Sequence, residues 1–336
     1  MVYSFQLVRH ANIRYREAVS RLGRCELLYM LRTFLPECQV SVEQIGGADF
    51  LTFECRELSP GELQFLSAHS GLVFFSAKEG ELLRPLETMA ESYLPEELPE
   101  VLKYKGKTSA SFTGMMINTA LSLTPYAPGD GSIRILDPMC GKGTTLFCAL
   151  MRGFHACGID TDRKGLKEGA DYFKRYLRIH LLKHTAVMKN ETAGKTGVPC
   201  ESFTFADTKE HFQAGDVRTA KFYCGDTALC GSLFRKKPFH LLVADIPYGI
   251  QHAPQSGHTP ESFTALLKRA APQWREALLP GGAAAISFNT LTLSRDKLNS
   301  ILEDSGFSVC TDDDLLHLRH EVEQAVVRDV IFAIRK

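Results

Sequence analysis

The sequence of 336 residues lacks any long apolar segment. It has no run of about 18 consecutive apolar residues, which excludes a membrane-spanning helix. Its N-terminus carries no basic head followed by the apolar stretch of a secretory signal. We therefore expect no membrane association and a cytoplasmic location. Apolar residues make up 44% of the chain, which allows a sizeable core in one large or two modest domains.

Metal-binding and repeat patterns are missing as well. The 10 cysteines include no C-x-x-C pair and no cluster with histidines at metal-ligand spacing. We therefore expect no bound metal and reduced thiols that belong mostly to the core. Internal repeats and low-complexity tracts do not occur, and the G-x-x-x-x-G-K-[ST] spacing of a phosphate-binding loop is absent.

The formal net charge is zero, but the two signs are unevenly distributed along the chain. Residues 1–100 hold 9 Lys and Arg against 15 Asp and Glu, whereas residues 101–200 hold 15 against 7. The basic middle segment is either an ordinary solvated surface or a footprint for a polyanion such as nucleic acid. Charge alone leaves both interpretations open.

The first hundred residues alternate between strand and helix patterns. Strands are expected at 3–8, 39–45, 49–58 and 71–77, and helices at 15–34 and 59–69. The order β-α-β-β-α-β is typical of a small ferredoxin-like α+β fold, which we assign to residues 1–95. Residues 96–110 are expected to form a linker, where Pro95 and Pro99 oppose a continuous helix.

From residue 111 onward, strands alternate with helices, which indicates a parallel sheet covered on both faces. Strands are expected at 133–137, 155–160, 221–226, 240–245, 283–288, 307–320 and 325–335, and the last two should form an antiparallel hairpin. The polar, glycine-containing segment 184–219 fits neither pattern, so we expect a long loop there.

The stretch "ILDPMCGKGTTL" runs from an apolar strand through a glycine-rich turn into a helix that begins near Thr144. Gly141 and Gly143 would let the backbone approach a ligand closely, and the first turn of the helix offers free N–H groups. An ordinary strand-to-helix turn that needs small residues would have the same sequence. The turn alone does not decide between these interpretations.

Acidic residues at the ends of the next two strands favour a nucleoside ligand. Asp160 follows Asp137 by 23 residues and stands where an open α/β sheet places the acceptor for ribose hydroxyls. Asp226 closes the third strand and would accept a hydrogen bond from an adenine amino group. Each aspartate taken singly would serve equally well as a helix cap. Their succession around one glycine-rich turn points to a nucleoside cofactor.

The fourth strand ends in "ADIPYG", which suits methylation of a base amine. The lone pair of such an amine is delocalised into the ring, so the nitrogen is a poor nucleophile. The Asp245 carboxylate and a carbonyl of Ile246 or Pro247 would accept its hydrogens and favour the pyramidal nitrogen that attacks a methyl group. Pro247 would fix the turn and Tyr248 would stack on the base. A plain β-turn is the alternative.

These motifs resemble those of class I S-adenosylmethionine-dependent methyltransferases that act on amino groups. Within that group the sequence is most similar to the tRNA guanine-N2 methyltransferases related to the THUMP-domain enzymes. The similarity rests on "YKGKTSASFTGMMINTA", "LDPMCGKGTTL" and "DIPYGIQ". It implies S-adenosyl-L-methionine as cofactor, tRNA as partner, and a Rossmann-like seven-stranded methyltransferase domain over residues 111–336, behind the ferredoxin-like domain.

The resemblance also assigns roles to residues of this chain. The catalytic residues would be Asp245, Pro247 and Tyr248. The cofactor-binding residues would be Thr108, Ser109, Asp137, Pro138, Cys140, Gly141, Gly143, Thr144, Asp160, Asp226 and Asp245. Cys140 would be a small packing residue in the cofactor turn rather than a nucleophile, since the cytosine-C5 methylases carry their cysteine after a proline on the catalytic loop, where this chain has Pro247-Tyr248.

Several alternatives stay open. The favoured function is methylation of guanine N2 in tRNA, and an adenine-N6 methyltransferase acting on DNA or rRNA would use the same loop. Ile246 replaces the first proline of the family motif, which loosens the choice of base. A cofactor-binding scaffold without catalysis is a third alternative. The N-terminal region is too short to hold a full THUMP domain besides the ferredoxin-like one. The oligomeric state and the need for a small activating subunit also stay open.

Overall fold

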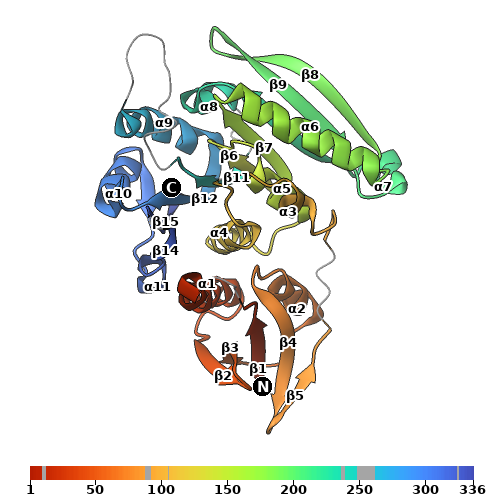
Figure 1. Ribbon diagram of the computed structural model, residues 1–336, viewed down its shortest axis with the longest axis vertical. Coiled ribbons are helices and arrows are strands. Elements are labelled where there is room, and N and C mark those ends of the chain that lie inside the picture. Colours follow the sequence, from red (N-terminus) through yellow and green to blue (C-terminus); the bar gives the residue numbers. More distant parts are fainter. Residues whose placement is uncertain (10–12, 88–91, 105, 236–238, 248–261, 324) are drawn as a thin grey trace.

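The computed structural model describes residues 1–9, 13–87, 92–104, 106–235, 239–247, 262–323 and 325–336. Two sheets organise these residues, a smaller one near the N-terminus and a larger one beyond it (Figure 1). No helix among the described residues is both long and apolar enough to cross a membrane. All ten cysteines are unpaired and seven of them are buried, so they lie mostly in the core as the sequence predicts.

The N-terminal part has the predicted ferredoxin-like arrangement. Its elements are β1 (Val2–Leu7), α1 (Ile13–Arg32), β2 (Val40–Ile45), β3 (Ala48–Glu54), α2 (Pro60–Ser67), β4 (Leu72–Glu79) and β5 (Leu82–Pro85). The antiparallel sheet has the order β2-β3-β1-β4-β5, in which β5 is an edge strand that the sequence did not predict. A capping box between Ser59 and Glu62 begins α2, where the sequence places its start.

The large sheet has the strand order β13-β15-β12-β11-β6-β7-β10-β9-β8, with β14 paired to β15. Its strands are β6 (Arg134–Asp137), β7 (His155–Asp160), β8 (His184–Ala193), β9 (Thr196–Phe205), β10 (Arg218–Cys224), β11 (Phe239–Asp245), β12 (Leu278–Asn289), β13 (Phe307–Val309), β14 (His320–Glu323) and β15 (Val326–Arg335). The helices are α3 (Leu98–Val101), α4 (Ala110–Ser122), α5 (Thr144–Met151), α6 (Arg163–Ile179), α7 (Lys209–Ala214), α8 (Cys230–Leu233), α9 (Phe263–Ala277), α10 (Arg295–Asp304) and α11 (Asp313–Leu316).

This order confirms the predicted Rossmann-like seven-stranded fold. Five neighbouring strands form a parallel core in the order β10-β7-β6-β11-β12. Strand β15 lies between β12 and β13 and is antiparallel to both. The carboxyl ends of β6, β7, β10 and β11 therefore meet at one edge of the sheet. The predicted division of the chain at residues 95 and 110 stays a prediction, and the short helix α3 lies inside the predicted linker.

Two predictions about the large sheet are wrong. Residues 307–320 do not form one strand, because β13 ends at Val309 and Asp312 then caps α11 before β14 begins. Residues 184–219 are not a long loop, since β8 and β9 form a hairpin that pairs along β10. Phe203 and Phe205 of this hairpin pack on Phe173 of α6. Most side chains of β8 are exposed, polar and apolar alike, which masks the strand pattern in the sequence.

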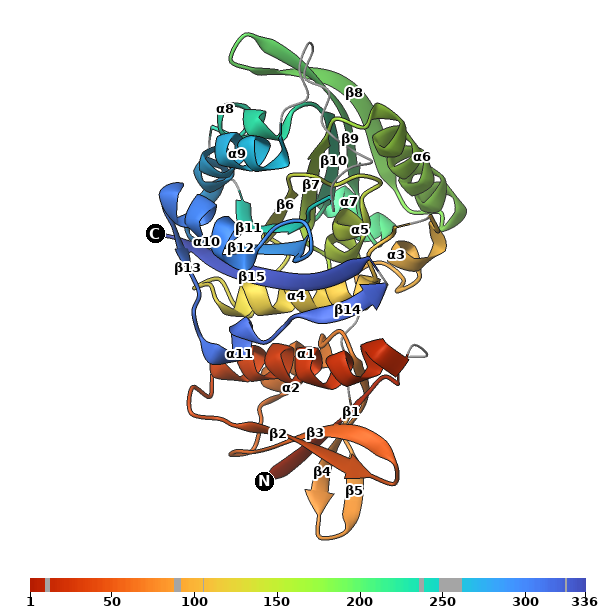
Figure 2. The ribbon, with the colours of Figure 1, turned by 60° about the vertical axis from the view of Figure 1, so that its left-hand side comes forward.

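The two sheets are joined by contacts between α1 and α4, which lie side by side in Figures 1 and 2. Arg24 and Arg32 of α1 form ion pairs with Asp314 of α11, at 2.7 Å and 3.3 Å. The fully buried Glu26 accepts hydrogen bonds from Ser70 Oγ over 2.6 Å and from Asn118 Nδ2 over 2.5 Å. The interface is therefore built from buried polar groups as well as apolar ones.

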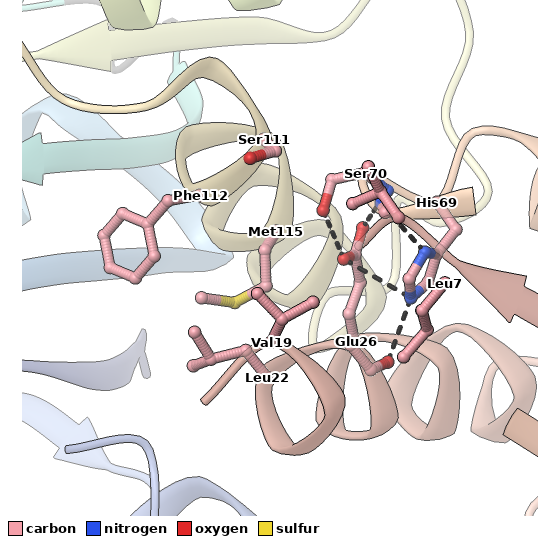
Figure 3. A pocket seen from close by; sticks show the side chains of 12 residues that line it. Leu7, Val19, Leu22, Glu26, His69, Ser70, Ser111, Phe112 and Met115 are labelled. Atoms are coloured by element: carbon pink, nitrogen blue, oxygen red, sulfur yellow. Dashed lines mark hydrogen bonds and ion pairs between the residues drawn. The ribbon is translucent and has the colours of Figure 1, made fainter. Parts of the chain in front are cut away.

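A cavity of about 40 Å³ lies beside these polar groups. Figure 3 shows Glu26 pointing toward Ser70 and His69, with Met115 of α4 on the opposite side of the cavity. A volume of this size holds a single water molecule. Asn118 of α4 thus belongs to this interface, where Arg152 also donates to its side-chain oxygen.

Candidate functional site

The glycine-rich turn after β6 has the backbone that its sequence predicts. Gly141 and Gly143 have φ angles of +49° and +92°, which side chains with a Cβ rarely adopt. Gly143 is the N-cap of α5, and no side chain caps that end of the helix. A Cβ on Gly141 would meet no atom within 4 Å, so there is open space on this side of the turn. The first N–H groups of α5 are available to a polar ligand.

Asp160 at the end of β7 is tied to this turn. The backbone N–H of Gly141 donates to Asp160 Oδ2 over 2.8 Å, and that of Asp162 donates to Oδ1 over 2.8 Å. The carboxylate therefore lies beside the glycine-rich turn, as the nucleoside interpretation expects. It also fixes the turn before any ligand binds.

Asp137 is the most deeply buried acid at this edge, with 3% of its surface exposed. Its Oδ1 accepts from the N–H of Met139 over 3.0 Å. Burial raises the pKa of Asp137 from 3.8 to about 7, against the opposing effect of hydrogen bonds from Thr145 and Met139. Near neutral pH this carboxyl therefore exchanges its proton easily, and a nearby cation would favour its ionised form.

We expect Asp137→Asn to remove a pH dependence of stability. The raised pKa means that the folded state holds a proton that the unfolded chain releases, so the free energy of unfolding falls as pH rises from about 4 to about 7. The total loss is of the order of 4 kcal/mol, at about 1.4 kcal/mol per pH unit. Urea unfolding of both proteins between these pH values measures it. Parallel pH profiles of the two proteins would contradict the assignment.

Cys140 packs inside the turn rather than facing a substrate. Its thiol is buried, and burial raises its pKa well above the ordinary value, so it stays protonated. A Cβ on Gly158 of β7 would lie 2.5 Å from the Cys140 sulfur, so the glycine makes room for the thiol. This geometry agrees with the sequence interpretation of Cys140 as a packing residue. Pro138, also buried, precedes it in the same turn.

The segment before α4 reaches the start of α5. Tyr104 and Thr144 share a hydrogen bond of 2.8 Å between their hydroxyl oxygens, and the Lys142 amine lies 5.0 Å from the centre of the Tyr104 ring. A hollow of about 430 Å³ opens here. It is lined by Glu100, Lys103, Tyr104, Lys107, Thr108 and Ser109. Ser109, exposed at the hollow, caps α4.

Asp226 is held by contacts on two sides. Its Oδ1 accepts from the N–H of Ala228 over 2.8 Å, and its Oδ2 forms an ion pair with Arg269 of α9 at 2.9 Å. The next residue, Thr227, accepts from the indole N–H of Trp274 over 2.8 Å. Helix α9 thus positions the third acidic strand end. Arg269 is a residue that the sequence interpretation did not include.

Asp245 at the end of β11 lies at the centre of a hydrogen-bond network. Its Oδ1 accepts from Ser287 Oγ over 2.7 Å, since the two residues are opposite each other in the β11–β12 register. Its Oδ2 accepts from the Thr108 hydroxyl and pairs with the Arg328 guanidinium at 3.2 Å. The Asp245 side chain is 15% exposed. The sequence expected Thr108 beside the cofactor, and the structure places it against Asp245.

Arg328 is the member of this network that the sequence interpretation missed. It lies on β15 with 5% of its surface exposed, and its guanidinium carbon is 4.8 Å from the centre of the Phe112 ring. The signal was the pair Arg328-Asp329 inside the otherwise apolar strand pattern 325–335. Successive side chains of a strand point to opposite faces of the sheet, so Arg328 pairs with Asp245 while Asp329 pairs with Arg295 at 2.8 Å.

The residues after Asp245 are described only in part. Ile246 is 1% exposed, and its N–H donates to the carbonyl of Ser287 over 2.9 Å. A proline, which has no N–H, could not form that bond. Pro247 is half-buried behind it. Tyr248, the predicted base-stacking residue, lies outside the described residues.

Solved structures with a similar fold include several S-adenosylmethionine-dependent methyltransferases. TrmN from Thermus thermophilus is 15% identical, with a TM-score of 0.37, over 89% of this chain and 60% of that chain. The T. thermophilus 16S rRNA N2 G1207 methyltransferase RsmC, in complex with AdoMet and guanosine, is 17% identical, with a TM-score of 0.38, over 91% and 60%. A methyltransferase from Clostridium acetobutylicum is 10% identical, with a TM-score of 0.39, over 66% and 90%.

The chain therefore spans 60% of the length of TrmN and of RsmC. No protein-family description and no curated protein sequence matches it. The fold class of this chain rests on its own strand order.

Proposed function

We propose that this protein transfers a methyl group from S-adenosyl-L-methionine to an exocyclic amine of a nucleobase in RNA, guanine N2 in tRNA, in the cytoplasm. The observation that carries the proposal is the placement of Asp245. Its carboxylate ends β11 at the edge that also holds the glycine-rich turn and Asp160, and Thr108, Ser287 and Arg328 anchor it. A strand end with an anchored hydrogen-bond acceptor next to a nucleoside site suits amine methylation.

The residues at the edge fit the cofactor. Asp137 would face its cationic amino-acid part, because a buried carboxyl with a pKa of about 7 ionises readily beside a positive charge. Asp160 would hold the ribose hydroxyls and Asp226 the adenine. The uncapped start of α5 at Gly143 would bind the carboxylate of the cofactor. When bound, the cofactor supplies an electrophilic methyl group on a sulfonium.

The chain itself supplies the groups that hold the amine. The carboxylate of Asp245 accepts an amine hydrogen and thereby localises the nitrogen lone pair for attack. Because its three anchors come from a linker and two strands, the carboxylate is oriented before the base arrives, and no reorganisation is needed at the moment of reaction. No strong base is required, since the proton leaves after the methyl group has been transferred.

The choice of guanine N2 in tRNA rests on the similarity of the loop and of the segment around Thr108 to the THUMP-related enzymes. Adenine N6 is the second candidate, and Ile246 is the observation that favours it. The Ile246 side chain packs in the core while its N–H extends the ladder with β12, so the turn differs from one that begins with proline.

The test is to incubate the protein with radiolabelled S-adenosylmethionine and either total tRNA, rRNA or DNA, and to identify the labelled nucleoside by mass spectrometry. We expect N2-methylguanosine in the tRNA. N6-methyladenosine in rRNA would support the second candidate instead. Label found in DNA alone would contradict an RNA substrate. Cofactor binding without label in any of the three nucleic acids would favour a non-catalytic scaffold.

A further inference from the structure

The outer face of α6 and the strand that follows it is basic. Residues 172–190 contain five Lys and Arg and no Asp or Glu. The basic side chains exposed on α6 and β8 and on the turn between them are Arg163, Lys164, Lys167, Arg175, Arg178, Lys183 and Lys189. We call this set the α6 basic face. It contains a large part of the positive charge in the middle third of the chain.

The acidic residues of α6 neutralise one member of this face, Lys167, and leave the others. Asp171 is paired with Lys167 at 2.5 Å, and Glu168 is paired with Lys142 of the glycine-rich turn. The other members of the face form no ion pair with the residues that the structure describes. They are Arg163, Lys164, Arg175, Arg178, Lys183 and Lys189. At the far end of the helix, Glu97 lies 3.6 Å from His180 rather than against an arginine.

The packing of α6 keeps these charges in solvent. On its inner face, the Phe173 ring packs edge to face against the rings of Phe203 and Phe205 of β9. Its centre lies 5.4 Å and 5.2 Å from theirs. Tyr172 packs against Phe147 of α5 at 5.3 Å. The helix is strongly amphipathic and held by aromatic contacts, so it does not rotate its arginines toward the core.

The α6 basic face begins at the reactive edge of the sheet. Asp162 caps α6 only two residues after Asp160, which is bound to the glycine-rich turn. From there the helix extends over 17 residues, about 25 Å, along the outside of the sheet (Figures 1 and 2). Lys103 and Lys107 line the hollow beside Thr108, and Arg163 and Lys164 begin α6 at the same edge. A polyanion whose base is bound near Asp245 would reach Arg175 and Arg178 by following the helix away from that edge.

We propose that the α6 basic face binds the phosphate backbone of the nucleic acid whose base is methylated. The identity of that nucleic acid as RNA rests on the proposed function. Arg175 and Arg178 are one helical turn apart on the exposed side, and a guanidinium binds phosphate oxygens in a bidentate manner. The acidic N-terminal hundred residues, with a net charge of −6, would not supply this contact.

The test is the double charge reversal Arg175→Glu/Arg178→Glu, with binding of a fluorescent tRNA transcript measured at several salt concentrations. We expect binding at 0.1 M salt to be weaker by about tenfold or more. Loss of two phosphate contacts also flattens the slope of log K against log salt by about 1.4 for single-stranded and 1.8 for duplex RNA. Arg175→Gln/Arg178→Gln should show a smaller loss in the same direction.

A matched control is Lys268→Glu/Lys297→Glu, which makes the same charge change on exposed positions of α9 and α10. We expect its tRNA affinity to stay within about twofold of the parent protein. Equal losses in both reversals would overturn the proposal, because the effect would then be one of net charge. Circular dichroism checks that the Arg175→Glu/Arg178→Glu variant is folded. The proposal would also be overturned if this folded variant bound tRNA as the parent protein does. The same holds if, in a parallel assay, the variant lost binding to anionic vesicles but not to tRNA.

Methyl transfer separates this inference from the proposed function. If both are right, Arg175→Glu/Arg178→Glu raises KM for tRNA with little change in kcat or in affinity for S-adenosylmethionine. If the parent protein labels no RNA, the proposed function fails, while the binding comparison still decides whether the α6 basic face holds a polyanion.

Discussion

Asp245→Ala is expected to lower the rate of methyl transfer by roughly a hundredfold to a thousandfold, as loss of a preorganised polar group in a reaction centre does. The variant keeps the glycine-rich turn, Asp137 and Asp160, which do not contact Asp245 through the hydrogen bonds described. Its affinity for S-adenosylmethionine should therefore stay close to that of the parent protein. Single-turnover transfer to tRNA and calorimetric titration of the cofactor measure the two quantities.

Two controls accompany Asp245→Ala. Ser287→Ala removes one anchor and leaves Thr108 and Arg328, so we expect a loss of about tenfold, the equivalent of about 1.5 kcal/mol at the lower end for a hydrogen bond to a charged group. Thermal unfolding checks that the Asp245→Ala variant is folded, because removal of the aspartate leaves the buried Arg328 without this ion pair. Unchanged methyl transfer in a folded Asp245→Ala variant would rule out the proposed mechanism.

Arg328→Ala has the second largest expected effect. A hydrogen bond to a charged group contributes about 1.5–3 kcal/mol, so we expect kcat to fall by about ten- to a hundredfold, with KM for tRNA and cofactor affinity nearly unchanged. Arg328 acts by positioning Asp245: its guanidinium packs over the Phe112 ring and pairs with Asp245 Oδ2 at 3.2 Å, which orients the carboxylate. Arg328→Lys keeps the charge and should restore part of kcat.

The matched control for Arg328 is Arg295→Ala. Arg295 is also a largely buried arginine, and it pairs with Asp329 on the same strand at 2.8 Å, away from Asp245. The Arg295→Ala variant should lower the unfolding temperature as much as Arg328→Ala does, because each substitution leaves a carboxylate without its ion pair. It should leave kcat within about threefold of the parent. An equal drop of kcat in both variants would mean that Arg328 acts only through stability.

The parts of the site that the sequence predicts are those whose partners are close along the chain or at equivalent strand ends. Gly141 and Asp160 are 19 residues apart, and the glycine-rich turn itself is a local backbone feature. Periodicity places both at the end of a strand, so their contact follows from the parallel sheet. The same reasoning gives Asp245 its place at the shared edge.

The anchors of Asp245 could not be predicted in this way. Thr108, Ser287 and Arg328 are 137, 42 and 83 residues away from it in sequence. No repeat or spacing links positions so distant, and their contact depends on the order in which β11, β12 and β15 assemble. Position in the sheet, rather than the local pattern, decided which arginine reaches the carboxylate.

The errors of fold prediction have a similar origin. The β8–β9 hairpin is an addition at the edge of the sheet, and most residues of β8 are exposed whether polar or apolar, so its alternation is weak. In residues 307–320 the run of aspartates from Asp312 to Asp314 interrupts the strand pattern, and two of these residues pair with Arg32 of α1. Both features depend on neighbours that local sequence does not identify.

The buried polar contacts between α1 and α4 hold the N-terminal sheet at a fixed distance from the reactive edge. If the two parts separated, Glu26 and Asn118 would lose their mutual hydrogen bond and would have to be hydrated instead. The N-terminal sheet is therefore held as a spacer beside the large sheet. Under the proposed function, a nucleic acid whose base is bound near Asp245 would meet this spacer at a set distance, so its shape as well as its base would limit which substrates fit.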